Sequence, residues 1–97
     1  MCEIEEITER VIEFRDKRDW KKYHKPKNLS ISISIESSEL LELFQWNDEI
    51  SNIDKEDLED EIADIFIYLL LMADATDIDI VKSVENKIEK NKAKYPK

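Results

Sequence analysis

The complete absence of glycine is the feature that most constrains how this chain of 97 residues can fold. Tight β-hairpins usually need Gly, or an Asn-Gly pair, at their turns. Proline occurs only at Pro26 and Pro96. We therefore expect an all-α fold. A single domain of this length, residues 1–97, buries only a modest core, so we also expect association with another copy to complete it.

Apolar residues recur at intervals of three and four along most of the chain, which predicts four amphipathic helices. The first three are expected over about residues 3–18, 29–46 and 55–75, and the last ends near residue 92. Residues expected to cap helix N-termini are Asn28, Asp54, and Asp77 or Asp79. The expected inner stripe of the third helix consists of Leu58, Ile62, Ile65, Phe66, Leu69 and Met72.

The segment LSISISI, residues 29–35, alternates apolar and polar residues as a half-buried strand would. The rest of the sequence offers no second strand-like run to pair with it, and a lone strand leaves its backbone groups unsatisfied. We therefore interpret this segment as helix. Its Ile residues then lie on several faces, which favours burial inside an oligomer.

Charge and cysteine content limit the partners that the chain can bind. With 24 acidic against 15 basic residues, the net charge of −9 disfavours binding to a nucleic-acid polymer. Cys2 is the only cysteine, which excludes an intramolecular disulfide and a thiolate zinc site. The charged N-terminus does not resemble a signal peptide, and no apolar run approaches the roughly 20 residues of a membrane span. We expect a cytoplasmic protein without a membrane partner.

Two pairs of acids are spaced so that they can meet. Glu36 and Glu39 are three residues apart, as are Glu61 and Asp64, so each pair projects from one face of its helix. Both Glu36 with Asp64 and Glu39 with Glu61 are centred on Ile50, in the loop between the two helices. If helices two and three form an antiparallel hairpin, all four carboxylates come to the same height.

Four clustered carboxylates repel one another and are driven to take up protons unless a cation is present. Ligands that are all oxygen suit Mg²⁺, with Mn²⁺ as the alternative, and argue against zinc. They also argue against a di-iron site of the Glu-x-x-His kind, because the only histidine, His24, lies in a loop. The competing interpretation is that the acids merely form solvated helix faces, but their symmetric placement favours a metal site.

The acidic signature, ESSE followed after 21 residues by EIAD, resembles the E-x-x-E and E-x-x-D motifs of the all-α MazG-like nucleoside triphosphate pyrophosphohydrolases. The flanking segments strengthen the resemblance, and they read RDWKKYHKPKNLSISISIESSELLELFQW, DIFIYLLLMAD and KIEKNKAKYP. Together they cover the chain from Arg18 to Pro96. The sequence is most similar to the small single-domain, dCTP pyrophosphatase-like members of that family.

The resemblance implies hydrolysis of (deoxy)nucleoside triphosphates to the monophosphate and pyrophosphate, which clears non-standard or excess nucleotides. It implies Mg²⁺ held by Glu36, Glu39, Glu61 and Asp64, with Glu36 or Glu39 as the catalytic base. Residues that would contact phosphate are Lys87, Asn91, Lys94 and Tyr95. Residues that would surround the base, in part from a neighbouring subunit of a homodimer or homotetramer, are Trp20, His24, Asn28, Trp46 and Tyr68.

Two other functions remain open on the residues alone. The same carboxylate arrangement would serve an all-α dUTPase-like enzyme or another nucleotide hydrolase. A helical interaction module without catalysis would use the acids only to organise charged surfaces. Assays with a panel of nucleotides separate these functions.

Overall fold

The structure, a computed structural model, describes residues 2–97. It contains the helices α1 (Glu3–Lys17), α2 (Pro26–Leu43), α3 (Lys55–Ala75) and α4 (Ile80–Lys94), with short 3₁₀ turns at Lys21–Tyr23 and Ile50–Asn52. No strand occurs among these residues, which confirms the all-α prediction. The alternating LSISISI segment is part of α2, and no described helix is long and apolar enough to cross a membrane.

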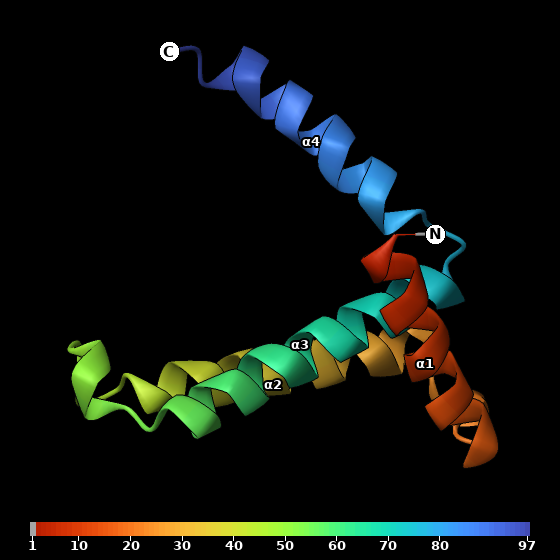
Figure 1. Cartoon of the computed structure of the whole chain (residues 1–97), viewed down its shortest axis with the longest axis horizontal. Helices are drawn as coiled ribbons and strands as arrows, with labels where there is room; N and C mark the ends of the chain where they lie inside the picture. The colour runs from red at the N-terminus through yellow and green to blue at the C-terminus, as the bar shows by residue number, and fades with distance from the viewer. Residues whose placement is uncertain (1) are drawn as a thin grey trace.

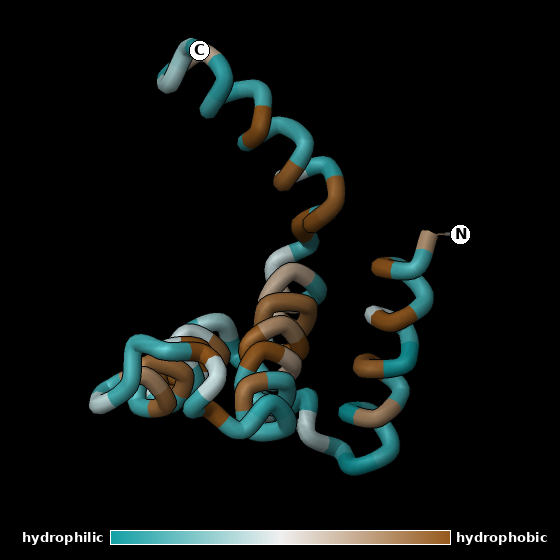
Figure 2. The backbone as a smooth tube through the Cα atoms, turned by 60° about the vertical axis from the view of Figure 1, so that its left-hand side comes forward, coloured by the Kyte–Doolittle hydropathy of each residue, from teal (hydrophilic) through white to brown (hydrophobic). Residues whose placement is uncertain are grey.

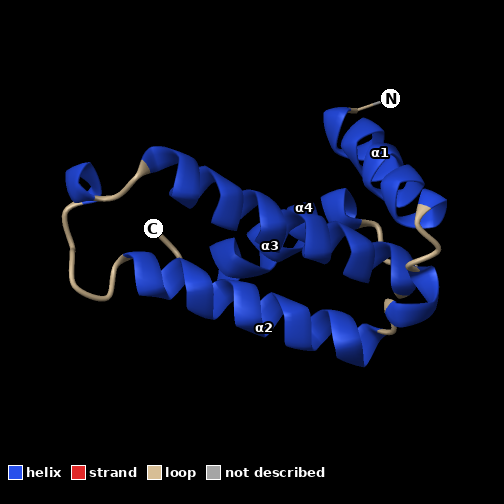
Figure 3. Ribbon diagram, turned by 90° about the horizontal axis from the view of Figure 1, so that it is seen from below, coloured by secondary structure: helices blue, strands red, loops and turns tan. Residues whose placement is uncertain are grey.

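The helices form a body of three and one projecting arm. α2 and α3 lie side by side and run in opposite directions (Figures 1 and 3). α1 packs across the end of this pair where α2 begins and α3 ends (Figure 1). α4 starts at that same end and then extends away from the body. Figure 2 shows that apolar positions continue along α4 after it has left the other helices.

Aspartate caps start two of the helices as expected. The Asp54 carboxylate accepts a hydrogen bond of 3.1 Å from the backbone N–H of Asp57 at the start of α3. Asp79 accepts one of 3.1 Å from the backbone N–H of Lys82 at the start of α4. Each cap satisfies a backbone donor that the first helical turn leaves free.

The prediction that Asn28 caps the second helix is wrong. α2 begins at Pro26, because proline at the first helical position has a suitable φ and no N–H to satisfy. Asn28 therefore lies inside the first turn, where its side-chain amide donates a hydrogen bond of 3.2 Å to the carbonyl of Tyr23. α2 also ends at Leu43, three residues before the expected boundary at Trp46.

Aspartates replace the missing glycines where α1 and α3 end. Asp19 and Asp77 adopt positive φ angles of 54° and 56°, the left-handed conformation that usually follows a helix C-terminus. The next residue then donates backward to the helix, from Trp20 to the carbonyl of Arg15 at 3.1 Å and from Ile78 to that of Ala73 at 2.9 Å. Asp77 thus ends α3, and Asp79 begins α4.

The core is small and lies where α1 crosses the helix pair. Leu29 and Leu70 are fully buried. Arg15 is only 4% exposed, and its guanidinium donates hydrogen bonds of 2.9 Å to both Asp16 and Asp74. The latter bond joins α1 to the end of α3, so a charged pair lies within the contact between these helices.

The expected inner stripe of α3 is only partly correct. Leu58, Ile65 and Met72 are half-buried, as expected of residues that share one helix face. The rest of the expected stripe is exposed, namely Ile62, Phe66 and Leu69. α3 is apolar on more than one side, and a single chain covers only part of that surface.

Candidate metal centre

Three glutamates from two helices converge midway along the α2–α3 pair. Glu36 and Glu39 share a face of α2 because they are three residues apart, and Glu61 reaches them from α3. One carboxylate oxygen from each residue lies within 4.8 Å of the other two. We refer to Glu36, Glu39 and Glu61 as the carboxylate cluster.

Two oxygens of this cluster are buried without a hydrogen-bond donor. They are the Oε2 atoms of Glu36 and Glu61. Burial, and then the neighbouring carboxylates of Glu39, Glu61 and Asp64, raise the pKa of Glu36 to about 7. Burial also raises the pKa of Glu61, and the negative charges of Glu39 and Asp64 raise it further. The protein alone therefore leaves these carboxylates short of positive charge.

Asp64 lies beside the carboxylate cluster. Its side chain is exposed, and it is not among the three residues whose oxygens converge within 4.8 Å. Its charge is nevertheless close enough to raise the pKa of both Glu36 and Glu61. A fourth acid is thus available at the edge of the group.

The donor set fits a hard divalent cation. All the converging atoms are carboxylate oxygens, the ligands preferred by Mg²⁺ and Mn²⁺. A bound cation would give the two buried oxygens the positive partner that they lack. These observations agree with the predicted metal site for Glu36, Glu39 and Glu61, with Asp64 adjacent.

The candidate phosphate-contacting residues lie apart from the cluster within one chain. Lys87, Asn91 and Lys94 belong to α4, and Tyr95 follows its last residue. All four are exposed, and α4 diverges from the α2–α3 pair (Figure 1). A single chain therefore leaves these groups on its projecting arm.

Of the aromatic residues expected near the base, only Tyr68 lies close to the acids in sequence and on the same helix face. Tyr68 is half-buried on α3, four residues after Asp64. Trp46 is 86% exposed beyond the end of α2. Trp20 packs edge-on against Phe14, with ring centroids 5.7 Å apart. One chain therefore does not gather these rings into one pocket.

The other two residues expected near the base take part in the connection between α1 and α2. Asn28 binds the carbonyl of Tyr23. His24 is half-buried, and its Nδ1 is buried without a hydrogen-bond partner. Burial, and then the Arg15 guanidinium, lower the pKa of His24. Both effects favour the neutral imidazole.

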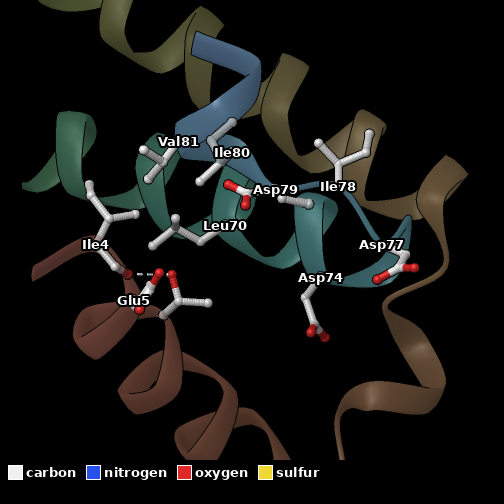
Figure 4. A pocket seen from close by; sticks show the side chains of 11 residues that line it. Ile4, Glu5, Leu70, Asp74, Asp77, Ile78, Asp79, Ile80 and Val81 are labelled. Carbon is white, nitrogen blue, oxygen red and sulfur yellow. Dashed lines mark hydrogen bonds between the residues drawn. The ribbon is translucent and has the colours of Figure 1, made fainter. Parts of the chain in front are cut away.

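Sequence reasoning missed the importance of Arg15. The sequence does contain a sign of its burial, because Arg15 is four residues after Val11 and therefore lies on the apolar face of the first helix. A cavity of about 380 Å³ lies close by, between α1, the end of α3 and the start of α4 (Figure 4). Its acids include Asp74 and Asp79, but the first pairs with Arg15 and the second caps α4. We interpret this cavity as part of the joint between these helices.

Fold and site together define an all-α protein with a cluster of carboxylate oxygens, of a kind that suits a divalent cation, between antiparallel helices. The chain belongs to the MazG-like family, whose model matches residues 31–97. It is 32% identical to dCTP pyrophosphatase 1 from Rattus norvegicus and 33% identical to that from Homo sapiens, in each case over 100 residues. Each match covers 96% of this chain and 59% of the relative, so the chain spans about three fifths of their length.

A solved structure agrees with this family assignment. The chain is 47% identical to a pyrophosphatase from Archaeoglobus fulgidus, with a TM-score of 0.91. The match covers 100% of this chain and 95% of the other. The arrangement of all four helices is therefore shared with that protein.

Proposed function

We propose that this chain hydrolyses (deoxy)nucleoside triphosphates to the monophosphate and pyrophosphate, with Mg²⁺ as cofactor and Mn²⁺ as a substitute. The observation that carries this proposal is the carboxylate cluster with its two buried, unpartnered oxygens. The similarity to dCTP pyrophosphatase 1 and to a pyrophosphatase supports the same reaction. Removal of non-standard or excess nucleotides is the role that we propose for it.

In this proposal the cluster and Asp64 hold the cation. When bound, Mg²⁺ supplies charge neutralisation for the triphosphate and polarises the α-phosphorus. Glu36 or Glu39 would act as the general base that accepts the proton of the attacking water. The products are a nucleoside monophosphate, pyrophosphate and the proton released by the water.

The remaining candidates would act in a homodimer or homotetramer. Lys87, Asn91, Lys94 and Tyr95 lie on the projecting arm, so we propose that they reach the triphosphate bound to another subunit. The base would then be held by residues of both subunits. Those that we propose for this role are Trp20, His24, Asn28, Trp46 and Tyr68.

A nucleotide panel with Mg²⁺ tests the reaction. Each dNTP and NTP is incubated with the protein, and the products are separated into monophosphate, diphosphate, pyrophosphate and phosphate. In water enriched in ¹⁸O, attack at the α-phosphorus places the label in the monophosphate, whereas attack at the β-phosphorus places it in pyrophosphate. Release of a diphosphate would indicate another kind of nucleotide hydrolase. A preference for dUTP would indicate a dUTPase-like enzyme. If the folded protein cleaves no nucleotide, it is an interaction module without catalysis.

Variants of the cluster test its role. We expect Glu39→Ala or Asp64→Ala to lower turnover by at least about 100-fold, because each removes a ligand of the cation. Glu59→Ala is the matched control, since this exposed acid of α3 lies outside the cluster. Circular dichroism should show equal helix content in all three variants. Full activity in Glu39→Ala would exclude Glu39 as an essential ligand.

A further inference from the structure

Arg15 is the one charged residue that is buried among residues 2–97, at 4% exposure. Its guanidinium donates hydrogen bonds to Asp16 on α1 and to Asp74 near the end of α3, each at 2.9 Å. Burying a charge costs free energy, and an apolar side chain of similar volume often packs as well in its place. What a guanidinium adds is direction, because its planar fork of donors fixes the acids that it binds.

The connection between α1 and α2, residues 18–25, is anchored at the same residue. The carbonyl of Arg15 accepts a hydrogen bond of 3.1 Å from the backbone N–H of Trp20. A 3₁₀ turn follows, in which the Trp20 carbonyl accepts one of 2.9 Å from the N–H of Tyr23. The side-chain amide of Asn28 donates to the Tyr23 carbonyl at 3.2 Å and joins this turn to α2. Two residues proposed for the nucleobase, Trp20 and Asn28, are thus linked to Arg15 by successive hydrogen bonds.

The ring of Trp20 is held in place as well as its backbone. It packs edge-on against Phe14, and the Arg18 guanidinium lies over both rings, 3.4 Å from the centroid of Phe14 and 5.8 Å from that of Trp20. These contacts still leave Trp20 43% exposed. A ring that is both fixed and accessible suits stacking on a base, because it loses little freedom on binding.

His24, which follows the 3₁₀ turn, lies close enough to Arg15 to be affected by its charge. The Nδ1 atom of His24 is buried without a hydrogen-bond partner. Burial, and then the Arg15 guanidinium, lower the pKa of this imidazole. A protonated ring would have an unpaired N–H donor at Nδ1 and a second positive charge near the first. Arg15 therefore favours a neutral His24 within the connection.

We infer that Arg15 is a positioning residue for the nucleobase, which acts through Trp20 and His24 and does not itself touch the substrate. Its side chain ties the end of α1 to Asp74, and so fixes the start of the connection relative to α3, the helix that carries Tyr68. The inference rests on the base-contacting roles proposed above for these residues. It assigns Arg15 to recognition of the base and not of the triphosphate.

Steady-state kinetics with two substrates tests the inference. One substrate is the nucleotide that wild type prefers, and the other is an abasic deoxyribose triphosphate. Arg15→Leu combined with Asp74→Ala, which leaves no buried charge, should raise KM for the nucleotide about tenfold. Its kcat for the nucleotide and its KM for the abasic triphosphate should stay near the wild-type values. A merely structural defect would affect both substrates alike.

Arg15→Lys is the second variant, and it carries the same comparison if the double variant does not fold. Lysine keeps the positive charge but lacks the fork of donors that binds Asp16 and Asp74 together. We expect a KM for the nucleotide between those of wild type and the double variant, again with no change for the abasic triphosphate. Circular dichroism of each variant checks its helix content.

The imidazole of His24 gives a readout that needs no substrate. His24 is the only histidine of the chain, so its ring resonances are assigned directly in NMR spectra of the untagged protein. In the double variant the pKa of His24 should rise, because the positive charge that lowers it has been removed. Arg10→Leu is the matched control, since it removes the same charge from an exposed position of α1. It should change neither this pKa nor either KM.

The inference and the proposed function fail on different results. If a folded double variant keeps the wild-type KM for the nucleotide, or loses affinity equally for both substrates, the inference is wrong and the proposed hydrolysis stands. An unchanged pKa of His24 in the double variant would also overturn the inference alone. If wild type cleaves no nucleotide, the proposed function fails, and the inference fails with it.

Discussion

Glu36 belongs to the candidate metal site and also makes the stability of the fold depend on pH. Its pKa is about 7 in the folded chain, against an ordinary value of 4.5. Between these two values the folded protein holds a proton that the unfolded chain releases. The free energy of unfolding therefore contains a contribution that is present at low pH and is lost as pH rises through about 7.

We predict that removing the Glu36 charge stabilises the metal-free protein above pH 7. Thermal melts of wild type and Glu36→Gln, recorded in EDTA from pH 5 to pH 8.5, should diverge as pH rises, with the variant more stable at the alkaline end. Glu59→Gln, at an exposed acid of α3 outside the cluster, serves as control. Parallel curves for wild type and Glu36→Gln would contradict the raised pKa.

Asp77 offers a second prediction at the scale of one residue. Its φ of 56° is easily adopted by Gly and disfavoured for side chains with a Cβ. We expect Asp77→Gly to add about 0.5 kcal/mol of stability, or about 2–4 °C in Tm, and Asp77→Ala to remove a similar amount. Calorimetry of the two variants beside wild type measures both shifts. Equal effects of Gly and Ala would exclude the backbone as the cause.

At the scale of the helices, the Arg15–Asp74 pair joins α1 to α3. Asp74→Ala leaves the buried guanidinium with Asp16 alone, which should cost about 1–3 kcal/mol in urea unfolding. Replacing the charge as well, in Arg15→Leu with Asp74→Ala, should recover part of that loss because no buried charge remains. Asp60→Ala on the exposed side of α3 should have little effect. A double variant less stable than Asp74→Ala would contradict this account.

The helices could be predicted from sequence because they depend on local spacing, and the carboxylate cluster because its acids are also placed symmetrically about the loop between α2 and α3. Asp54 and Asp79 cap helices through contacts three residues away, and Glu36 with Glu39 share a face by the same geometry. Other features depend on contacts that no local pattern contains. Asn28 does not cap α2, because the helix begins two residues earlier, at Pro26, with Lys25 at the N-cap position.

The exposed positions of α3 and α4 mark the limit of sequence reasoning more clearly. Ile62 and Ile88 follow the periodicity of buried residues, yet both are exposed. Periodicity shows that a face is apolar, but it does not show whether the same chain or another copy covers it. The direction in which α4 leaves the body depends on the turn at Asp77. The backbone of Asp77 is left-handed, but the sequence has no glycine there to indicate this conformation.

For the whole molecule, association should appear as stability that depends on concentration. If a second copy covers the exposed apolar surface, the folded dimer is favoured by mass action, and Tm should rise with protein concentration. The Ile88→Glu variant should show a Tm that does not change over the same range. Calorimetry at several concentrations measures both. A wild-type Tm independent of concentration would count against self-association.

The carboxylate cluster also constrains the order in which ligands can arrive. From residue 28 to residue 81 the only basic side chain is Lys55, at the start of α3, so the helix pair offers the cluster almost no positive charge of its own. A triphosphate without a cation would be repelled by the acids of this helix pair. Uncomplexed nucleotide should therefore be a poor competitor, and its excess should slow turnover by withdrawing Mg²⁺. The electrostatics of the site would make the chelate, and not the nucleotide alone, the true substrate.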